Sequence, residues 1–257
     1  YQPMTRWLKL IAKDAIRLKR QRLFEDFRAN RKKCSDDPYF IGLKILAEVS
    51  TSHHLTSVFN LMATAPSRWD DGYSLDSERF KEAVKLICEH GHRIGLHASY
   101  RAYDSPELLR QEKTRLEEAA GIDISICRQH YLRVQTPQSW IAMSTAGLSK
   151  DTSYGFPEHE GFRCGTCFPF TVFNFLEDCE LPLIEEPLII MDGTLRTYRR
   201  LGIKDAVDQI KGLAEMCKSV GGTFTLLWHN SSFFRDWEVW GEEYPHIIAN
   251  LMEMAKD

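Results

Sequence analysis

The sequence predicts an α/β fold with a largely parallel sheet, either a parallel α/β barrel or a doubly wound sheet. Short apolar runs typical of buried strands alternate along the chain with longer segments of helical periodicity. The repeated order of helix then strand is characteristic of parallel α/β architectures. The 257 residues contain no internal repeat and no low-complexity segment, so one large domain is expected after a short N-terminal segment.

Composition excludes several classes of protein. The formal net charge of −3 is too small to indicate a nucleic-acid partner, and none is expected. No apolar run is long enough to span a bilayer, and no signal peptide is visible. The seven cysteines form an odd, scattered set, which argues against a disulfide scaffold and favours the reducing cytoplasm.

The N-terminal segment, residues 1–37, is interpreted as a basic amphipathic helical region that precedes the main domain, residues 38–257. Apolar side chains between Trp7 and Leu18 recur at helical spacing, with lysines and arginines between them. Residues 1–33 could therefore contact an anionic membrane surface peripherally. Packing of the apolar stripe against the domain is the commoner use of such a helix and is favoured.

The elements of the main domain follow in order. Helices are expected over residues 42–55, 77–89, 105–120, 137–146, 204–219 and 243–256, and strands over residues 56–63, 93–98, 124–129, 150–153, 183–190 and 223–228. Pro106 in the first turn and Gly121 after the last mark the two ends of the third helix. Pro187 weakens the strand prediction for residues 183–190. Residues 155–179 are expected to be irregular and rich in aromatic side chains.

Single histidines stand where three apolar runs end. His97 follows Ile94-Gly95-Leu96, His130 lies just past a run that ends at Cys127, and His229 follows Leu226-Leu227-Trp228. Catalytic groups gather at the carboxyl ends of strands in parallel α/β folds, so one pocket is predicted. A neutral imidazole can bind a divalent metal, which makes His97 and His130 candidate ligands, although a satisfied core histidine is the alternative for His130. His229 is a candidate general acid or base.

Other polar residues have weaker signals. Asp151 ends a short strand and Arg163 follows in a long loop, a combination that holds a charged group in place or is purely structural. Trp69-Asp70-Asp71-Gly72 is a local turn signal. Cys164-Gly165-Thr166-Cys167 has redox or zinc half-site spacing, but without a second such pair it is attributed to chance.

Together these segments resemble the polysaccharide deacetylase superfamily, the carbohydrate esterases of the NodB-homology type, and most closely a divergent bacterial branch. The resemblance runs from about Pro38 to the end of the chain. The order and spacing of its segments match the second to fifth motifs of the family: Gly91–Tyr100, Arg128–Leu132, Asp151–Phe156, Gly161–Arg163 and Leu226–Asn230.

The resemblance implies a distorted (β/α) barrel and a metal-dependent hydrolase that removes N- or O-acetyl groups from a carbohydrate, such as a cell-envelope or surface polysaccharide or its precursor. A divalent metal, usually Zn²⁺, supplies the electrophile. The residue roles that it implies are metal binding by His97 and His130, catalysis by His229, Asp151 and Arg163, and substrate binding by Arg128, Tyr131, Trp228 and Asn230.

Two departures from the family pattern bear on activity. Arg101 stands where the common pattern has its second metal histidine, so that ligand is lost unless His130 replaces it. The Asp pair of the first motif is missing, because Asp70-Asp71 comes after the first strand and too near His97 to be taken as the base. The missing pair is expected upstream of Tyr1 or in another segment outside this sequence, which would make the chain either a trimmed enzyme or a non-catalytic relative. The chain is accordingly expected to be a carbohydrate deacetylase or, alternatively, a non-catalytic glycan-binding relative.

Overall fold

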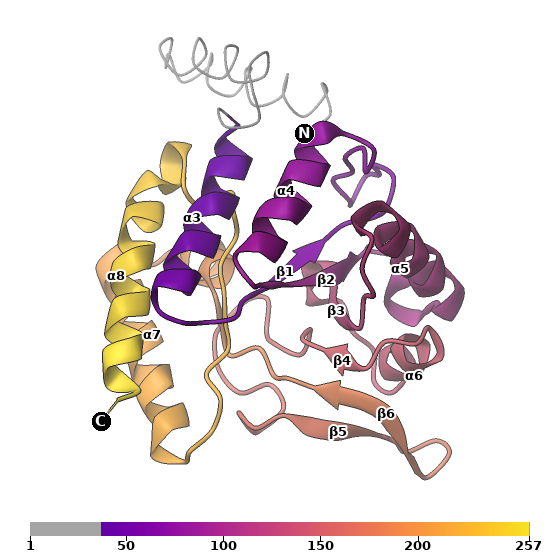
Figure 1. Cartoon of the computed structure of the whole chain (residues 1–257). Coiled ribbons are helices and arrows are strands. Elements are labelled where there is room, and N and C mark those ends of the chain that lie inside the picture. Colours follow the sequence, from indigo (N-terminus) through magenta and orange to yellow (C-terminus); the bar gives the residue numbers. More distant parts are fainter. Residues whose placement is uncertain (1–36, 257) are drawn as a thin grey trace.

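The computed structural model describes residues 37–256. The basic segment predicted over residues 1–37 therefore lies, apart from Asp37, outside the described residues. The described chain is a curled, mostly parallel α/β structure, as the sequence predicted (Figure 1). No helix within residues 37–256 combines the length and apolar character that crossing a bilayer requires.

Two sheets carry the strands. The larger has the order β1-β2-β3-β4-β6-β5, and β7 and β8 form a separate two-stranded parallel sheet. All neighbours in the larger sheet are parallel except β5 and β6. The strands are β1 (Val58–Leu61), β2 (Arg93–Ala98), β3 (Ile126–Gln129), β4 (Lys150–Asp151), β5 (Phe170–Asn174), β6 (Cys179–Glu185), β7 (Ile190–Met191) and β8 (Leu226–Leu227).

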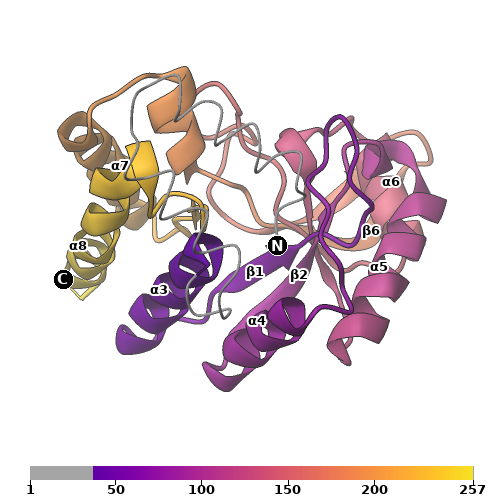
Figure 2. The same cartoon turned by 90° about the horizontal axis from the view of Figure 1, so that it is seen from above.

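Helices surround the curled sheet. Figure 2 shows α3, α4, α5 and α6 along one side of it, and α7 and α8 pack with β7 in a second apolar cluster. The helices are α3 (Pro38–Ser52), α4 (Glu78–Glu89), α5 (Pro106–Ala120), α6 (Gln138–Thr145), α7 (Ile203–Ser219) and α8 (Glu238–Met254). Short helical turns cover Ala102–Asp104, His130–Leu132, Thr194–Tyr198 and Arg235–Trp237.

Local sequence explains how these elements begin and end. Ser105 caps α5 by accepting from the backbone N of Leu108, Pro106 occupies its first turn, and Gly121 ends it at φ 70°. The central strands β2 and β3 are largely buried, with Leu96 and Cys127 fully so, which explains their continuous apolar character. Each parallel strand therefore delivers the residue after its apolar run to the same edge of the sheet.

Three element predictions need correction. The strand expected over residues 183–190 is two strands, β6 and β7, in different sheets, because Pro187 between them has no N–H to continue a ladder. The region 155–179, expected to be irregular, contains β5, where Val172 is buried and its neighbours Thr171 and Phe173 are exposed. The final helix begins at Glu238 rather than at residue 243 and contains Pro245.

Candidate functional site

The three predicted histidines lie at the carboxyl ends of parallel strands. His97 is near the end of β2, His130 directly follows β3, and His229 comes just after β8. The register of β2 and β3 places His97 opposite Arg128. The sheet therefore brings His97 and His130 together, while His229 approaches from the smaller sheet.

The His97 imidazole is neutral and fixed in one tautomer. Its Nδ1 lies 2.9 Å from the carbonyl oxygen of Arg128, which can only accept, so Nδ1 carries the proton and Nε2 has the lone pair. Burial, and next the charge of His130, lower the pKa of His97 to about 3. His97 is thus prepared to act as a ligand through Nε2 at any ordinary pH.

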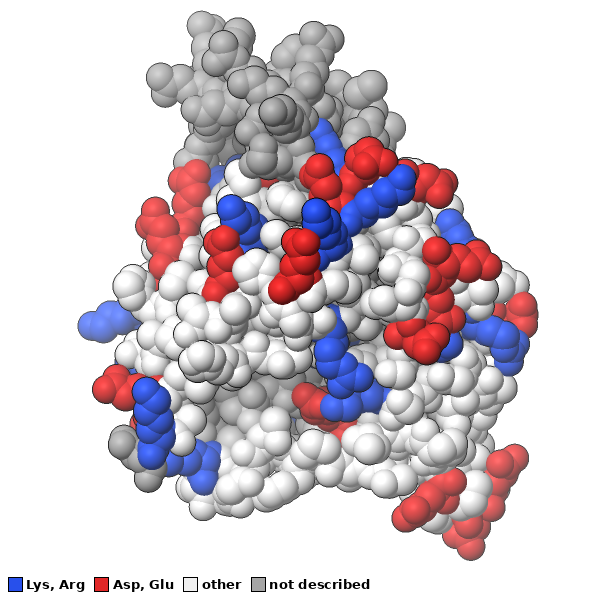
Figure 3. All heavy atoms as spheres, viewed as in Figure 1, with Lys and Arg blue, Asp and Glu red and all other residues white. Residues whose placement is uncertain are grey.

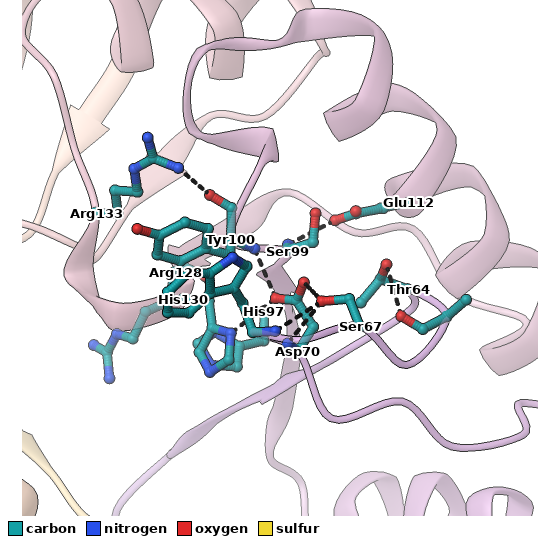
Figure 4. Close-up of polar contacts among 12 residues, drawn as sticks. Thr64, Ser67, Asp70, His97, Ser99, Tyr100, Glu112, Arg128, His130 and Arg133 are labelled. Carbon is teal, nitrogen blue, oxygen red and sulfur yellow. Dashed lines mark hydrogen bonds and ion pairs between the residues drawn. The ribbon is translucent and has the colours of Figure 1, made fainter.

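His130 is held by a buried carboxylate. Its Nδ1 lies 2.9 Å from Oδ1 of Asp70, and its ring centroid lies 4.9 Å from that of His97 (Figure 4). Because Asp70 occupies Nδ1, a metal would be bound through Nε2 of His130. In both histidines, therefore, Nδ1 is hydrogen-bonded to an oxygen and Nε2 is the nitrogen that would bind a metal.

Asp70 is an orienting residue in this geometry. Its Oδ1 also accepts from the backbone N of Tyr100 at 2.7 Å, and its Oδ2 accepts from Oγ of Ser67 at 2.7 Å. Burial raises the pKa of Asp70, but the hydrogen bonds from His130, Ser67 and Tyr100 outweigh it and lower the pKa. Both carboxylate oxygens of Asp70 therefore accept hydrogen bonds that fix its position.

The backbone beside His130 is strained. Tyr131 and Leu132 have φ values of 59° and 51°, a left-handed conformation that is uncommon for bulky residues. Such strain is concentrated at functional sites. It leaves the Tyr131 side chain 52% exposed, with its ring centroid 4.4 Å from that of His130. Tyr131 therefore lies where a molecule bound at the histidines would touch it.

His229 forms a second pair with Asp192. The Nδ1 of His229 lies 2.6 Å from Oδ1 of Asp192, and its backbone N donates to Oδ2 at 2.9 Å. Oγ of Ser232 donates to the same Oδ2 at 2.6 Å. Burial lowers the pKa of His229, but the charge and hydrogen bond of Asp192 raise it above its usual value. The half-exposed ring of His229 is therefore held through Nδ1, and Asp192 favours its protonated form.

Arg128 connects the two halves of the site. Its charge lowers the pKa of both His97 and His229, and the charge of His229 also lowers that of His97, so these groups lie close together. Nε of Arg128 donates to the carbonyl oxygen of Thr152 at 2.9 Å and to its Oγ1 at 3.1 Å. No described residue accepts a hydrogen bond from the terminal nitrogens of this guanidinium. They can therefore bind a substrate or another carboxylate.

Beneath Arg128 lie two buried carboxyl groups. Asp151 on β4 stands opposite Glu185 on β6, and both are 0% exposed. Oδ1 of Asp151 accepts from the backbone N and the hydroxyl of Ser153, while Glu185 accepts from the backbone N of Tyr154 and from Nε1 of Trp140. Burial, and next the charge of Asp151, raise the pKa of Glu185 to about 11. The pair therefore shares one proton at neutral pH.

Two other predicted site residues, Arg163 and Trp228, contact residues away from His97 and His130. Arg163 donates to the carbonyl oxygen of Gly155 at 3.0 Å and lies over the ring of Tyr154, and within residues 37–256 it makes no hydrogen bond or ion pair with Asp151. Trp228 packs against Tyr244, with ring centroids 5.2 Å apart. The structure does not bring these two side chains to the histidine cluster.

Helix α3 supports the loop that carries His229. Nδ2 of Asn230 donates to the carbonyl oxygen of Tyr39 at 3.1 Å. The backbones approach so closely that a Cβ at Gly42 would lie 2.1 Å from the carbonyl oxygen of Asn230. Glycine is required here for space, and the helix sets the position of the residue after His229.

Two residues of the site were not assigned from the sequence. Asp192 follows the apolar run Ile189-Ile190-Met191, so it too stands at the end of a strand. A single strand predicted over residues 183–190 ends before Met191 and does not place Asp192 at a strand end. Asp70 reaches His130 from 60 residues away in the chain, and no local signal predicts that contact.

The histidine pair fits a divalent metal that accepts imidazole ligands. Zinc-binding histidines usually donate their second ring nitrogen to a carbonyl or carboxylate, as His97 and His130 do here. Within residues 37–256, no third His, Cys, Asp or Glu side chain completes a group that could hold an ion. The described residues therefore supply part of a coordination shell.

Comparisons with known proteins agree with the fold. No protein-family model and no curated protein matches the sequence. A crystal structure from Mycobacterium smegmatis, provisionally assigned as a polysaccharide deacetylase, matches with a TM-score of 0.62 and 15% identity, over 96% of this chain and 80% of that one. The Xyl-CE4 domain of a multidomain xylanase from the hindgut metagenome of Trinervitermes trinervoides matches with a TM-score of 0.44 and 12% identity, over 83% and 78% of the two chains. The first likeness confirms the predicted fold.

Proposed function

We propose, from the polysaccharide deacetylase fold of this chain, that it is a metal-dependent hydrolase that removes acetyl groups from a carbohydrate. One observation carries the proposal. His97 and His130, each held through Nδ1, share a site with the His229–Asp192 pair and with Arg128. Paired ligand imidazoles and a separate proton donor are the groups that metal-assisted hydrolysis requires.

The metal would be held by Nε2 of His97 and Nε2 of His130, and zinc is the ion that we propose. When bound, it would polarise the acetyl carbonyl and lower the pKa of a bound water. Asp70 holds the His130 ring and the Arg128 carbonyl holds the His97 ring, so both imidazoles keep their direction without the ion.

His229 would protonate the leaving group. Asp192 keeps Nδ1 engaged and stabilises the charged ring, so the proton to be transferred resides on Nε2. The sugar nitrogen or oxygen takes this proton as its bond to the acetyl carbon breaks. His229 is then neutral and must regain a proton from water before the next cycle.

Arg128 and Tyr131 would contact the carbohydrate. Arg128 offers its terminal nitrogens to polar groups of the substrate. The exposed ring of Tyr131 offers an apolar face to a sugar. Asp151, fully buried below Arg128, acts as a positioning residue through the charge that it places near this guanidinium.

The direct test measures acetate release from a panel of N- and O-acetylated oligosaccharides by the purified chain with zinc added. His229→Ala should lower turnover by roughly 10²–10⁴-fold, the usual range for a lost general acid, without reducing bound zinc. His246→Ala, which removes an exposed histidine on α8, is the matched control and should leave turnover unchanged.

Two results would contradict the proposal. Glycan binding without acetate release by the unaltered chain would identify a non-catalytic glycan-binding relative. Loss of activity in His246→Ala equal to that in His229→Ala would show that the measured hydrolysis does not depend on this site.

A further inference from the structure

The outer strand of the larger sheet has an unpaired edge. β5 is the last strand in the order β1-β2-β3-β4-β6-β5, and Figure 1 shows it at the lower rim of the molecule. Among the described residues, the backbone of Phe170–Phe173 makes hydrogen bonds only with β6. An edge with free N–H and C=O groups is a template for another strand.

Large apolar side chains stand exposed along this edge. Phe175 and Leu176 are 59% and 63% exposed, values far above those of core residues. We call the group the β5 face, and its members are Phe168, Phe173, Phe175, Leu176 and Ile184. Ile184 is opposite Thr171 in the ladder, and after an irregularity in the register Phe173 is opposite Glu180. Exposed large apolar side chains gathered on two neighbouring strands and their turn mark a candidate interaction site.

The charge pattern favours a second copy of this chain as the partner that binds at the β5 edge. Residues 164–176 contain no charged side chain, so two such segments can meet without opposing like charges. Acidic residues begin only at the turn, with Glu177, Asp178 and Glu180. Figure 3 shows a mostly uncharged lower rim with acidic side chains gathered at its right-hand end. This acidic end would repel an anionic lipid surface.

We propose that two copies of this chain pair antiparallel through β5, across a two-fold axis near Val172 and Phe173. The arrangement is self-complementary, because each strand offers the same groups to the other. It joins the two larger sheets into one and brings Phe173 of each copy beside that of the other. The acidic turn of each copy lies beyond the start of the partner's β5, where residues 164–169 are uncharged.

The test measures molecular mass in solution by sedimentation equilibrium over a range of protein concentrations. We expect the unaltered chain to reach twice its mass of 29.8 kDa at micromolar concentration. Phe173→Glu and Phe173→Lys, each alone, place like charges beside the axis and should raise the dissociation constant by about tenfold or more. An equimolar mixture of the two variants should dimerise again, because opposite charges then face each other.

Val239→Glu is the matched control, since it adds a charge at an exposed apolar position on α8. It should leave the dissociation constant unchanged. If the Phe173 variants lose helical circular dichroism, Phe175→Glu replaces them, because Phe175 lies outside the strand. An unaltered chain that stays monomeric at about 100 µM, or a mixture that fails to dimerise, would overturn the proposal. Monomers that sediment with phosphatidylglycerol vesicles would instead identify a lipid-binding face.

Discussion

Asp70 is far from His130 in the sequence but contacts it in the folded chain. It follows β1 by several residues, which argued against a catalytic role, yet its carboxylate holds His130 in place. An orienting carboxylate raises the basicity of the imidazole that it contacts. In the proposed metal site, Asp70 would therefore act on metal affinity rather than on proton abstraction.

Asp70→Asn should weaken zinc binding by roughly 10–100-fold, the usual effect of removing such a partner. The amide still accepts from His130 but carries no charge to strengthen the ligand. Zinc titration by competition with a chromophoric chelator measures the affinity. Asp76→Asn, an exposed carboxylate in the turn before α4, is the control and should bind zinc normally. Equal affinities in all three proteins would remove Asp70 from the metal site.

Asp192→Asn should move the alkaline limb of the pH–activity profile to lower pH. Asp192 raises the pKa of His229, so its removal lowers that pKa, and the protonated donor is then lost at a lower pH. The profile of kcat/KM against pH checks this. Asp208→Asn on α7 should leave the limb in place. A purely structural role for Asp192 would reduce activity at every pH without moving the limb.

Residues with a local signal could be found from the sequence, and residues without one could not. His97, His130 and His229 each end an apolar run, and that pattern placed them at strand ends. Asp70 is recognised only by its distance to His130 in the folded chain. The strained φ of Tyr131 is likewise invisible in the sequence, because nothing there favours a left-handed tyrosine.

At the scale of elements, β4 and β6 place two carboxyl groups opposite each other inside the sheet. The raised pKa of Glu185 means that its charged form is disfavoured in the folded chain. Its unfolded pKa is about 4.3, so the free energy of unfolding falls as the pH rises from there toward the folded pKa.

Glu185→Gln should therefore raise Tm at pH 8, while near pH 4 the variant and the unaltered chain should melt together. The amide oxygen can still accept from the backbone N of Tyr154, the amide NH2 gives up the long 3.3 Å hydrogen bond from Nε1 of Trp140, and the titrating group is removed. A chain of this size gains about 2–4 °C for each kcal/mol. Thermal melts at the two pH values measure the effect. Glu186→Gln breaks the ion pair with Lys150 and should give no stabilisation at pH 8. A pH-independent difference for Glu185→Gln would refute the shared proton.

Two of the three corrected predictions concern short strands. Pro187 divides one apolar run between two sheets, and β5 alternates too briefly to be recognised among aromatic residues. Long amphipathic helices such as α5 were predicted nearly to the residue, because capping and periodicity agree there. Short strands depend on neighbours that only the fold provides.

At the scale of the whole molecule, the proposed site draws on both sheets. β2 and β3 bring the ligand histidines, and the β7–β8 pair brings Asp192 and His229. The alternation of helices and strands was sufficient to predict the fold class. The meeting of the two sheets at Arg128 was not predictable, because it depends on how the strands curl.

Zinc should raise Tm of the unaltered chain, because a ligand that binds the folded state adds stability by mass action, about 2.7 kcal/mol at one hundred times Kd. His97→Ala should show no such rise, since it removes one of the two ligands. Melts with and without added zinc, and with zinc plus chelator, make the comparison. An equal rise in both proteins would place the bound zinc elsewhere.

Helix α3 and the loop after His229 meet at Gly42, where a single methyl group would collide with the carbonyl oxygen of Asn230. The geometry of proton donation is thereby tied to a position nearly the whole chain away. A substitution at Gly42 and the conformation of the loop at Asn230 are therefore not independent. A side chain gained at Gly42 would demand a compensating shift of the loop.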